Sequence, residues 1–496
     1  MLAQALQIVL QPDVLLTVFL AGCFGMFVGA IPGLTATMAT ALLVPITFFM
    51  DPIPAIASIV AATGMAIFAG DIAGTLMRMP GTPASAAYVE DAHRMSQAGK
   101  ANVALGACLF FSAIGGILGT LVLSLVAPQL AELALKFSSF EYFWLVLLGL
   151  SCAVFVSSGA PALGLISLFI GLSASLVGQE NPTGASRYTY GSVELLAGIQ
   201  FIPAMIGLFA VSEILRSYTK RSTEARIPPV KGPIFAPQLT NLLRYPKQVL
   251  RGSSVGTLIG ALPGAGADIA AWISFAISKK FSREQKKFGT GHVEGLVEAG
   301  ASNNAAVSGA WIPALVFGIP GDTITAIVIG VMFIKGLNPG PMVFIQQPEM
   351  IYAIFMIFVL ANLFMLPIGW VAIHVAGKLL GAPQRILMPV ILVFCAVGAF
   401  AINNSMAGVI IMLAFGVIGF LMEENGIPLA PAILGLVLGP MLEKYFITSM
   451  IKADGDFLAF FSRPISAGLG IATILLCLIP LVGWLRRRGL GQRKSA

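Results

Sequence analysis

Apolar segments long enough to cross a membrane follow one another along almost the whole chain. A helix needs about 20 apolar residues to span a bilayer, and runs of this order begin near residue 14 and continue to residue 485. Only 10% of the 496 residues are charged, against about 25% in an average soluble domain. We therefore predict an all-α polytopic integral membrane protein with about 12 transmembrane helices.

The two halves of the chain repeat each other. The motif Gly25-x3-Gly29-Ala-Ile-Pro32-Gly33 matches a motif that begins at Gly256 and ends at Pro263-Gly264, 231 positions later. Pro80-Gly81 matches Pro320-Gly321, 240 positions later. These landmarks occur in the same order with nearly constant offsets. We predict a first membrane repeat over 1–217, a basic linker over 218–250, a second repeat over 251–450, and a terminal helix with a basic tail over 451–496.

The basic residues predict how the repeats are oriented. Residues 216–251 hold eight Lys or Arg against one acid, and residues 486–494 hold five against none. Such segments are typically cytoplasmic. The linker and the tail then lie on the same side, and one further helix separates the tail from the second repeat. The repeats therefore end on opposite sides of the membrane and are inverted, an arrangement typical of secondary transporters.

Four Pro-Gly pairs lie within apolar sequence, at 32–33, 80–81, 263–264 and 320–321. Proline and glycine break helices, and a half-helix that starts at a break presents unpaired N–H groups to an anion. We expect broken or re-entrant helices whose breaks line a substrate cavity. The alternative is that each break is a simple kink whose Thr, Ser or Asp caps a helix. The candidate substrate-binding residues are Pro32, Gly33, Thr35, Arg78, Gly81, Thr82, Ser85, Gly264, Asn303, Asn304, Gly321 and Thr323.

Carboxylates at membrane depth are costly and are candidates for function. Asp71, Asp268 and Asp322 are the cation-coupling candidates, with Glu298 a fourth acid that either serves the same purpose or lies solvated near a loop. Arg78 either pairs with a substrate carboxylate or neutralises Asp71.

The Asn303-Asn304 pair either binds a polar ligand or forms an interhelical hydrogen bond. The chain has no G-x4-G-K-[ST] loop and no His or Cys pattern with metal-ligand spacing. We therefore predict no enzyme activity, no bound metal and no cofactor beyond Na⁺ or H⁺ as a coupling ion.

Several motifs resemble the large membrane subunit of tripartite tricarboxylate transporters. They include Gly29-Ala-Ile-Pro-Gly33, Pro80-Gly-Thr-Pro-Ala-Ser85, Gly318-Ile-Pro-Gly-Asp322 and Gly336-Leu-Asn-Pro-Gly-Pro341. The resemblance implies a multi-pass protein of the bacterial inner membrane. It also implies ion-driven import of a tricarboxylate or dicarboxylate, a small partner subunit of about four helices, and a periplasmic solute-binding protein that delivers the substrate.

The chain departs from this family pattern at two places. Arg78 stands where the family typically has Asn, and Ala299-Gly300 where it typically has Pro-Glu. The choice of substrate and ion therefore stays open. A passive organic-anion channel is the alternative function, since it would share the polar breaks but need no gradient.

Overall fold

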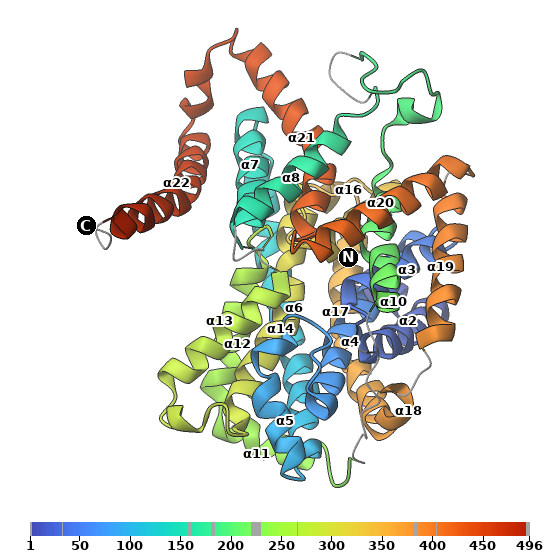
Figure 1. The fold of residues 1–496 in the computed structure, drawn as a ribbon, viewed down its shortest axis with the longest axis vertical. Helices are drawn as coiled ribbons and strands as arrows, with labels where there is room; N and C mark the ends of the chain where they lie inside the picture. Colours follow the sequence, from blue (N-terminus) through green and yellow to red (C-terminus); the bar gives the residue numbers. More distant parts are fainter. Residues whose placement is uncertain are drawn as a thin grey trace. The chain divides into compact units, whose positions relative to one another are not determined.

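The chain folds almost entirely into helices. The computed structural model describes residues 2–31, 33–156, 161–179, 184–219, 230–264, 266–380, 384–402 and 404–492. Helices make up 80% of it, and the described residues contain no strand, only one isolated bridge between Gly178 and Arg187. The predicted all-α class is confirmed. The chain forms two compact units (Figure 1).

Unit 1 comprises residues 1–132 and 202–421. Its N-terminal helices are α1 (Leu2–Val9), α2 (Pro12–Ala30), α3 (Ala36–Thr47), α4 (Pro52–Met77), the 3₁₀ turn η1 (Ser85–Ala87), α5 (Val89–Gln97) and α6 (Ala101–Ala134). Its central helices are α9 (Phe201–Ile206), the π-helical turn η3 (Gly207–Val211), α10 (Ser212–Thr219), α11 (Ala236–Arg244), α12 (Pro246–Gly260), α13 (Gly266–Phe281), η4 (Gln285–Lys287) and α14 (Val293–Phe317). Its remaining helices are α15 (Thr323–Ile334), α16 (Val343–Gln346), α17 (Pro348–His374), α18 (Ala376–Leu380), α19 (Gln384–Ala401) and α20 (Met406–Glu424).

Unit 2 comprises residues 133–201 and 422–496. It holds α7 (Ser139–Val156), α8 (Pro161–Ser175), the short turn η2 (Glu194–Ala197), α21 (Ala430–Lys452), η5 (Phe457–Phe461) and α22 (Pro464–Gln492). Helix α21 packs on α7 and α8 (Figure 1), and Arg187 forms an ion pair with Glu443 within the unit. Each unit thus combines segments from both halves of the sequence. The repeat boundaries themselves stay a prediction.

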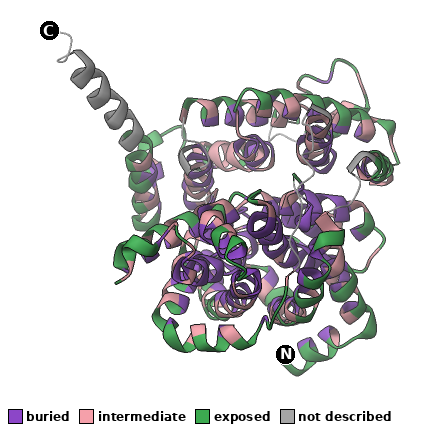
Figure 2. Cartoon of the chain, turned by 60° about the horizontal axis from the view of Figure 1, so that its bottom comes forward, coloured by how far each residue is buried: buried purple, intermediate pink, exposed green. Residues whose placement is uncertain are grey.

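Several helices are long and apolar enough to cross a membrane. Among the described residues, six qualify by length and composition: α2, α4, α6, α17, α20 and α21. Six further apolar helices are shorter, from 10 to 17 residues. Burial differs sharply between them, since 94% of the apolar window of α4 is buried but only 33% of that of α20. Figure 2 shows the same contrast between buried purple helices and helices with green exposed faces. The structure supports a multi-pass membrane protein; twelve spans and their inversion stay predictions.

Two helix pairs of unit 1 pack closely, and glycines bring each pair together. Helix α2 packs on α4, and α12 packs on α14 (Figure 1). A Cβ on Gly29 would lie 2.3 Å from the carbonyl oxygen of Ala66, and one on Gly260 would lie 2.1 Å from that of Ala306. Side chains at these glycines would therefore force the helices apart. Gly29 and Gly260 are 231 positions apart and Ala66 and Ala306 are 240 apart, so these contacts recur at the offsets found in the sequence.

Candidate functional site

All four Pro-Gly pairs lie between helices of unit 1. Helix α2 ends at Ala30 and α3 begins at Ala36; α12 ends at Gly260 and α13 begins at Gly266. The other two pairs follow the ends of α4 and α14. We number the breaks 1 to 4 in chain order, at 32–33, 80–81, 263–264 and 320–321. Pro32 lies outside the described residues.

The four breaks contact one another. The hydroxyl of Thr37, just after break 1, lies 3.3 Å from that of Thr323, just after break 4. The Gly264 N–H donates to the Gly321 carbonyl at 2.7 Å, which joins breaks 3 and 4. The Ala84 N–H donates to Asp268 Oδ1 at 3.2 Å, which joins break 2 to the first turn of α13. Segments up to 286 residues apart in the chain therefore meet at one place.

The loops after breaks 2 and 4 are capped in the same way. Thr82 and Ser85 exchange hydrogen bonds between their side chains and backbone N–H groups, at 3.2 and 3.1 Å. Asp322 and Thr325 do the same, at 2.8 Å each, as a capping box at the start of α15. The capping role that sequence analysis held as an alternative is therefore present at both breaks.

Burial divides the predicted site residues into two groups. The accessible group is Gly33, Thr35, Arg78, Gly264 and Thr323, together with Asp268 and Asp322; Thr37, which was not among the predicted site residues, is also partly accessible. The buried group is Gly81, Thr82, Ser85, Asn303, Asn304, Gly321 and Asp71. In this conformation residues at the N-terminal ends of α3, α13 and α15 are exposed or partly exposed, whereas the hydroxyls of Thr82 and Ser85 accept hydrogen bonds from backbone N–H groups.

Asp268 and Asp322 lie close together at breaks 3 and 4. A Cβ on Gly266, two residues before Asp268, would lie 3.1 Å from Asp322 Cβ. Both carboxylates lie in the first turn or at the N-cap of a half-helix, where the helix dipole favours negative charge. None of the ion pairs formed by the described residues involves either one. Two acidic groups without a basic partner therefore face an accessible region.

Asp71 is the third coupling candidate and has a different environment. Its carboxyl is buried, with 1% of the residue exposed, and accepts a hydrogen bond from the Tyr88 hydroxyl at 2.7 Å. Asn303 Nδ2 lies 3.5 Å from the same hydroxyl. Arg78 does not contact Asp71; it pairs with Glu90 at 2.7 Å, so the proposed neutralisation of Asp71 by Arg78 is not found.

Asn304 lies at the wall of a small cavity between α4, α14 and α17. Its Nδ2 lies 3.5 Å from the Gly64 carbonyl and from Met365 Sδ, while the Oδ1 atoms of Asn304 and Asn362 are buried without a partner. The cavity has a volume of about 10 Å³ in which the centre of a water molecule fits, and this is close to the minimum volume that holds one water. The cavity is too small for a carboxylate ligand, so Asn304 cannot bind the substrate there without rearrangement.

Comparison with known proteins places the chain in a family. The model of the tripartite tricarboxylate transporter TctA family matches residues 15–434. The chain belongs to this family. A TctA protein is the large subunit of a tripartite transporter, so membership implies partner subunits.

Two relatives of this TctA chain come from Agrobacterium vitis. An uncharacterized 52.8 kDa protein in the TAR-I ttuC' 3' region is 33% identical over 477 residues, 95% of each chain. An uncharacterized protein in the TAR-II ttuC' 3' region is 34% identical over 230 residues, covering 46% of this chain and 95% of the relative. No solved structure matches this chain.

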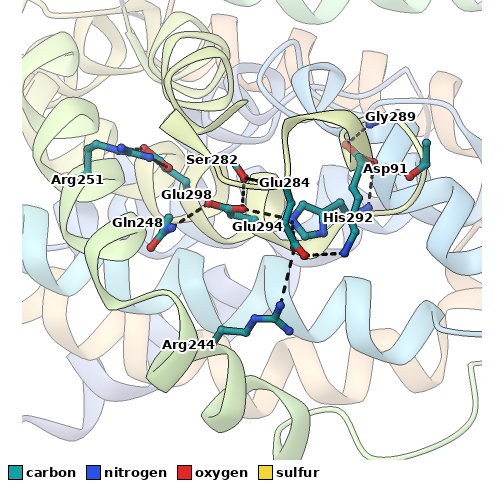
Figure 3. Close-up of polar contacts among 12 residues, drawn as sticks. Asp91, Arg244, Gln248, Arg251, Ser282, Glu284, Gly289, His292, Glu294 and Glu298 are labelled. Carbon is teal, nitrogen blue, oxygen red and sulfur yellow. Dashed lines mark hydrogen bonds and ion pairs between the residues drawn. The ribbon is translucent and has the colours of Figure 1, made fainter. Parts of the chain in front are cut away.

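Glu294 and Glu298, at the start of α14, belong to a second polar cluster of the TctA chain (Figure 3). Glu298 is fully buried and holds Arg251 through two hydrogen bonds of 2.5 Å. Glu294 is also buried and accepts from Gln248 at 2.8 Å and Ser282 at 2.6 Å. The alternative that Glu298 lies solvated near a loop is therefore not found. Because Glu298 is already paired, it is a poor coupling candidate.

The same cluster continues into the loop that follows α13. Glu284 lies between Arg244 and His292 (Figure 3), at 3.8 and 3.4 Å. The hydrogen bond from Lys287 holds the pKa of the Glu284 carboxyl below its ordinary value of 4.5. Asp91 on α5 accepts the backbone N–H groups of Gly289, Gly291 and His292. These contacts fasten α5, α11, α12 and α14 together away from the breaks.

Sequence analysis did not identify Tyr88, Trp272 or Asn362. Tyr88 holds Asp71, Trp272 Nε1 donates to the Pro83 carbonyl beside break 2 at 3.0 Å, and Asn362 lines the cavity beside Asn304. Of these three residues, only Asn362 could have been singled out from the sequence, because an amide within the apolar helix α17 is unusual.

Proposed function

We propose that this chain is the large membrane subunit of a secondary transporter that imports a tricarboxylate or dicarboxylate, driven by an ion gradient. A periplasmic solute-binding protein delivers the substrate, and a small four-helix membrane subunit completes the complex in the bacterial inner membrane. The observation that carries the proposal is the meeting of the four helix breaks in unit 1, with Thr37 and Thr323 in contact.

The start of α3 is better suited to bind an anion than the starts of α13 and α15, which carry Asp268 and Asp322. Its first turn carries no acid, Gly33 is exposed, and Thr35 and Thr37 are only partly buried. The unpaired N–H groups and the positive end of the helix dipole stabilise a carboxylate. Thr37 and Thr323 supply hydroxyl donors beside it.

Asp268 and Asp322 then explain why a cation must accompany the substrate. A carboxylate substrate that enters next to two unpaired carboxylates is repelled, because like charges a few ångströms apart in a region of low dielectric constant are costly. A cation bound between them removes this repulsion, and break-loop carbonyls are suitable further ligands for Na⁺. Substrate and cation binding are therefore expected to favour each other.

The test is uptake of labelled citrate and labelled dicarboxylates into proteoliposomes that contain this chain and its small partner. The binding protein is added or omitted, and a Na⁺ gradient, a proton gradient or neither is imposed. Accumulation above equilibrium that needs both a gradient and the binding protein supports the proposal and identifies the ion. Equilibration that needs neither supports the passive channel and excludes coupling by the aspartates.

A further inference from the structure

We propose that Asp71 is a proton-binding group of this transporter: its carboxyl is neutral in the conformation described here and exchanges its proton when break 2 moves. This inference rests on the proposed function in so far as it assigns the proton a role in transport. The protonation itself is a separate claim and has a separate test.

The burial of Asp71 favours the neutral carboxyl. It lies on α4, whose apolar window is 94% buried, and only 1% of the residue is exposed. An ionised carboxylate in such a place needs a cation or several donors, because burying an unpaired charge is so costly that the group neutralises instead. Asp71 Oδ1 accepts one hydrogen bond, from Tyr88, and Oδ2 has no partner. A proton on Oδ2 removes the charge and leaves Oδ1 as the acceptor for Tyr88.

In the part of the chain that the structure describes, Asp71 takes part in no ion pair. The Cys108 thiol on α6 is buried and contacts Asp71. On α5, His93 Nδ1 lies 3.0 Å from the Thr75 carbonyl, one turn along α4 from Asp71, and Arg94 pairs with Glu90.

The remaining nearby charges are already paired elsewhere. Arg78 at the end of α4 pairs with Glu90, and Asp91 on α5 accepts three backbone N–H groups. On α14, Glu298 holds Arg251. Helices α2 and α17 carry Asp13, Glu349 and His374 in their first or last turns, and their other titratable side chains, Cys23 and Tyr352, supply no positive charge.

Both residues of the Asp71–Tyr88 hydrogen bond are next in sequence to residues that form or contact the break-2 loop. Asp71 follows Gly70, whose carbonyl accepts the Gly81 N–H at 3.2 Å, and a Cβ on Gly81 would lie 2.5 Å from Gly70 Cα. Tyr88 directly follows η1, the turn that ends the break-2 loop. Water cannot hydrate Asp71 while this loop is closed. Proton exchange and loop movement are therefore expected to occur together.

The second half of the chain has no equivalent of this group. At the offset of 240 positions, Asp71 corresponds to Trp311 and Tyr88 to Val328. Trp311 is also buried, with 1% exposed. The Asp71–Tyr88 pair therefore occurs once in each chain.

Infrared difference spectroscopy tests the protonation. The purified complex at neutral pH is expected to show the carbonyl band of a protonated carboxyl that is absent from Asp71→Asn, and Tyr88→Phe is expected to shift this band because the carbonyl loses its hydrogen bond. Asp13→Asn, which changes an exposed carboxyl, is the matched control and should leave the band unchanged. A wild-type minus Asp71→Asn difference without such a band overturns the inference.

Transport tests the role of the proton. Asp71→Asn mimics the neutral carboxyl, so it is expected to retain substrate exchange across the membrane while accumulation driven by a pH gradient falls to a ratio of one. Asp71→Asn that accumulates substrate like the wild type, or a wild type that responds to a sodium gradient alone, overturns the coupling role. A wild type that transports no carboxylate at all refutes the proposed function and leaves the infrared result to decide the protonation.

Discussion

Gly260→Ala is expected to destabilise the α12–α14 pair. The new Cβ would lie 2.1 Å from the Ala306 carbonyl oxygen, whereas ordinary contacts begin at 3.4 Å, so the helices must separate by roughly 1 Å. The carbonyl belongs to the backbone of α14 and cannot move on its own. Overpacking of this kind costs about 1–3 kcal/mol, partly offset by the better helix propensity of alanine, at most about 1 kcal/mol.

The assay for Gly260→Ala is thermal unfolding of the purified protein in detergent. Each kcal/mol lowers the unfolding midpoint of a domain of about 150–250 residues by about 2–4 °C, and that of a larger unit by less, so a decrease of at most a few degrees is expected. Gly377→Ala is the matched control, because a Cβ on Gly377 meets nothing within 4 Å. A Gly260→Ala variant with the same midpoint as Gly377→Ala would refute the packing argument.

Three further perturbations test other parts of the structure. Asp322→Ala and Asp322→Asn should both reduce gradient-driven uptake in proteoliposomes. The loss of the helix cap destabilises mainly the Ala variant, by about 0.5–2 kcal/mol. Normal uptake in Asp322→Asn would remove this residue from the mechanism. Glu298→Gln leaves Arg251 without its counter-charge. The free energy of unfolding falls by up to about 3–5 kcal/mol when a buried pair is broken, and by less here because the Arg251 side chain is 31% exposed. Size-exclusion chromatography should show less folded protein, and the double variant with Arg251→Gln should recover part of it. Because the native pKa of Glu284 lies below 4.5, this residue stabilises the fold above that pH and loses the effect as pH falls through the native pKa. The unfolding midpoint of Glu284→Gln should therefore fall less on acidification than that of the wild type. An equal decrease of the midpoint in both proteins would contradict this.

Local sequence patterns were sufficient to predict the all-helical class and the positions of the helix breaks. Proline and glycine act within one or two turns, so Pro263-Gly264 and Pro320-Gly321 mark helix ends whatever surrounds them. The caps are local as well, since Asp322 and Thr325 are only three residues apart. The glycine ladder around Gly29 also indicated close helix packing.

The partners of the buried polar groups were not predictable, because they depend on how distant segments pack. Asp71 and Arg78 have opposite charges and lie seven residues apart in the sequence, so a pair between them was one of two open alternatives. Instead Arg78 adopts a left-handed conformation with φ of 58° at the end of α4, and its exposed side chain pairs with Glu90. Tyr88 reaches Asp71 because the break-2 loop folds back against Gly70, which no local pattern indicates.

The exposure of the candidate substrate-binding residues also depended on tertiary structure. Thr82 and Thr37 both follow a Pro-Gly break and carry the same hydroxyl group. In the fold, Thr82 is 6% exposed and acts as a cap, whereas Thr37 remains partly accessible and faces Thr323. The candidate site therefore narrows to the ends of α3, α13 and α15.

Tricarboxylate binding by the Thr37→Val, Thr323→Val double variant tests most directly whether the converging breaks hold the substrate. Labelled citrate would be titrated onto the purified complex in the presence of Na⁺, with Thr290→Val as the control, since Thr290 lies in the loop after η4. Hydrogen bonds to a charged group contribute about 1.5–3 kcal/mol each, so the double variant, which loses two of them, should bind at least roughly a hundredfold more weakly than the wild type and the control. Equal affinity in all three proteins would contradict the assignment of the breaks as the substrate site.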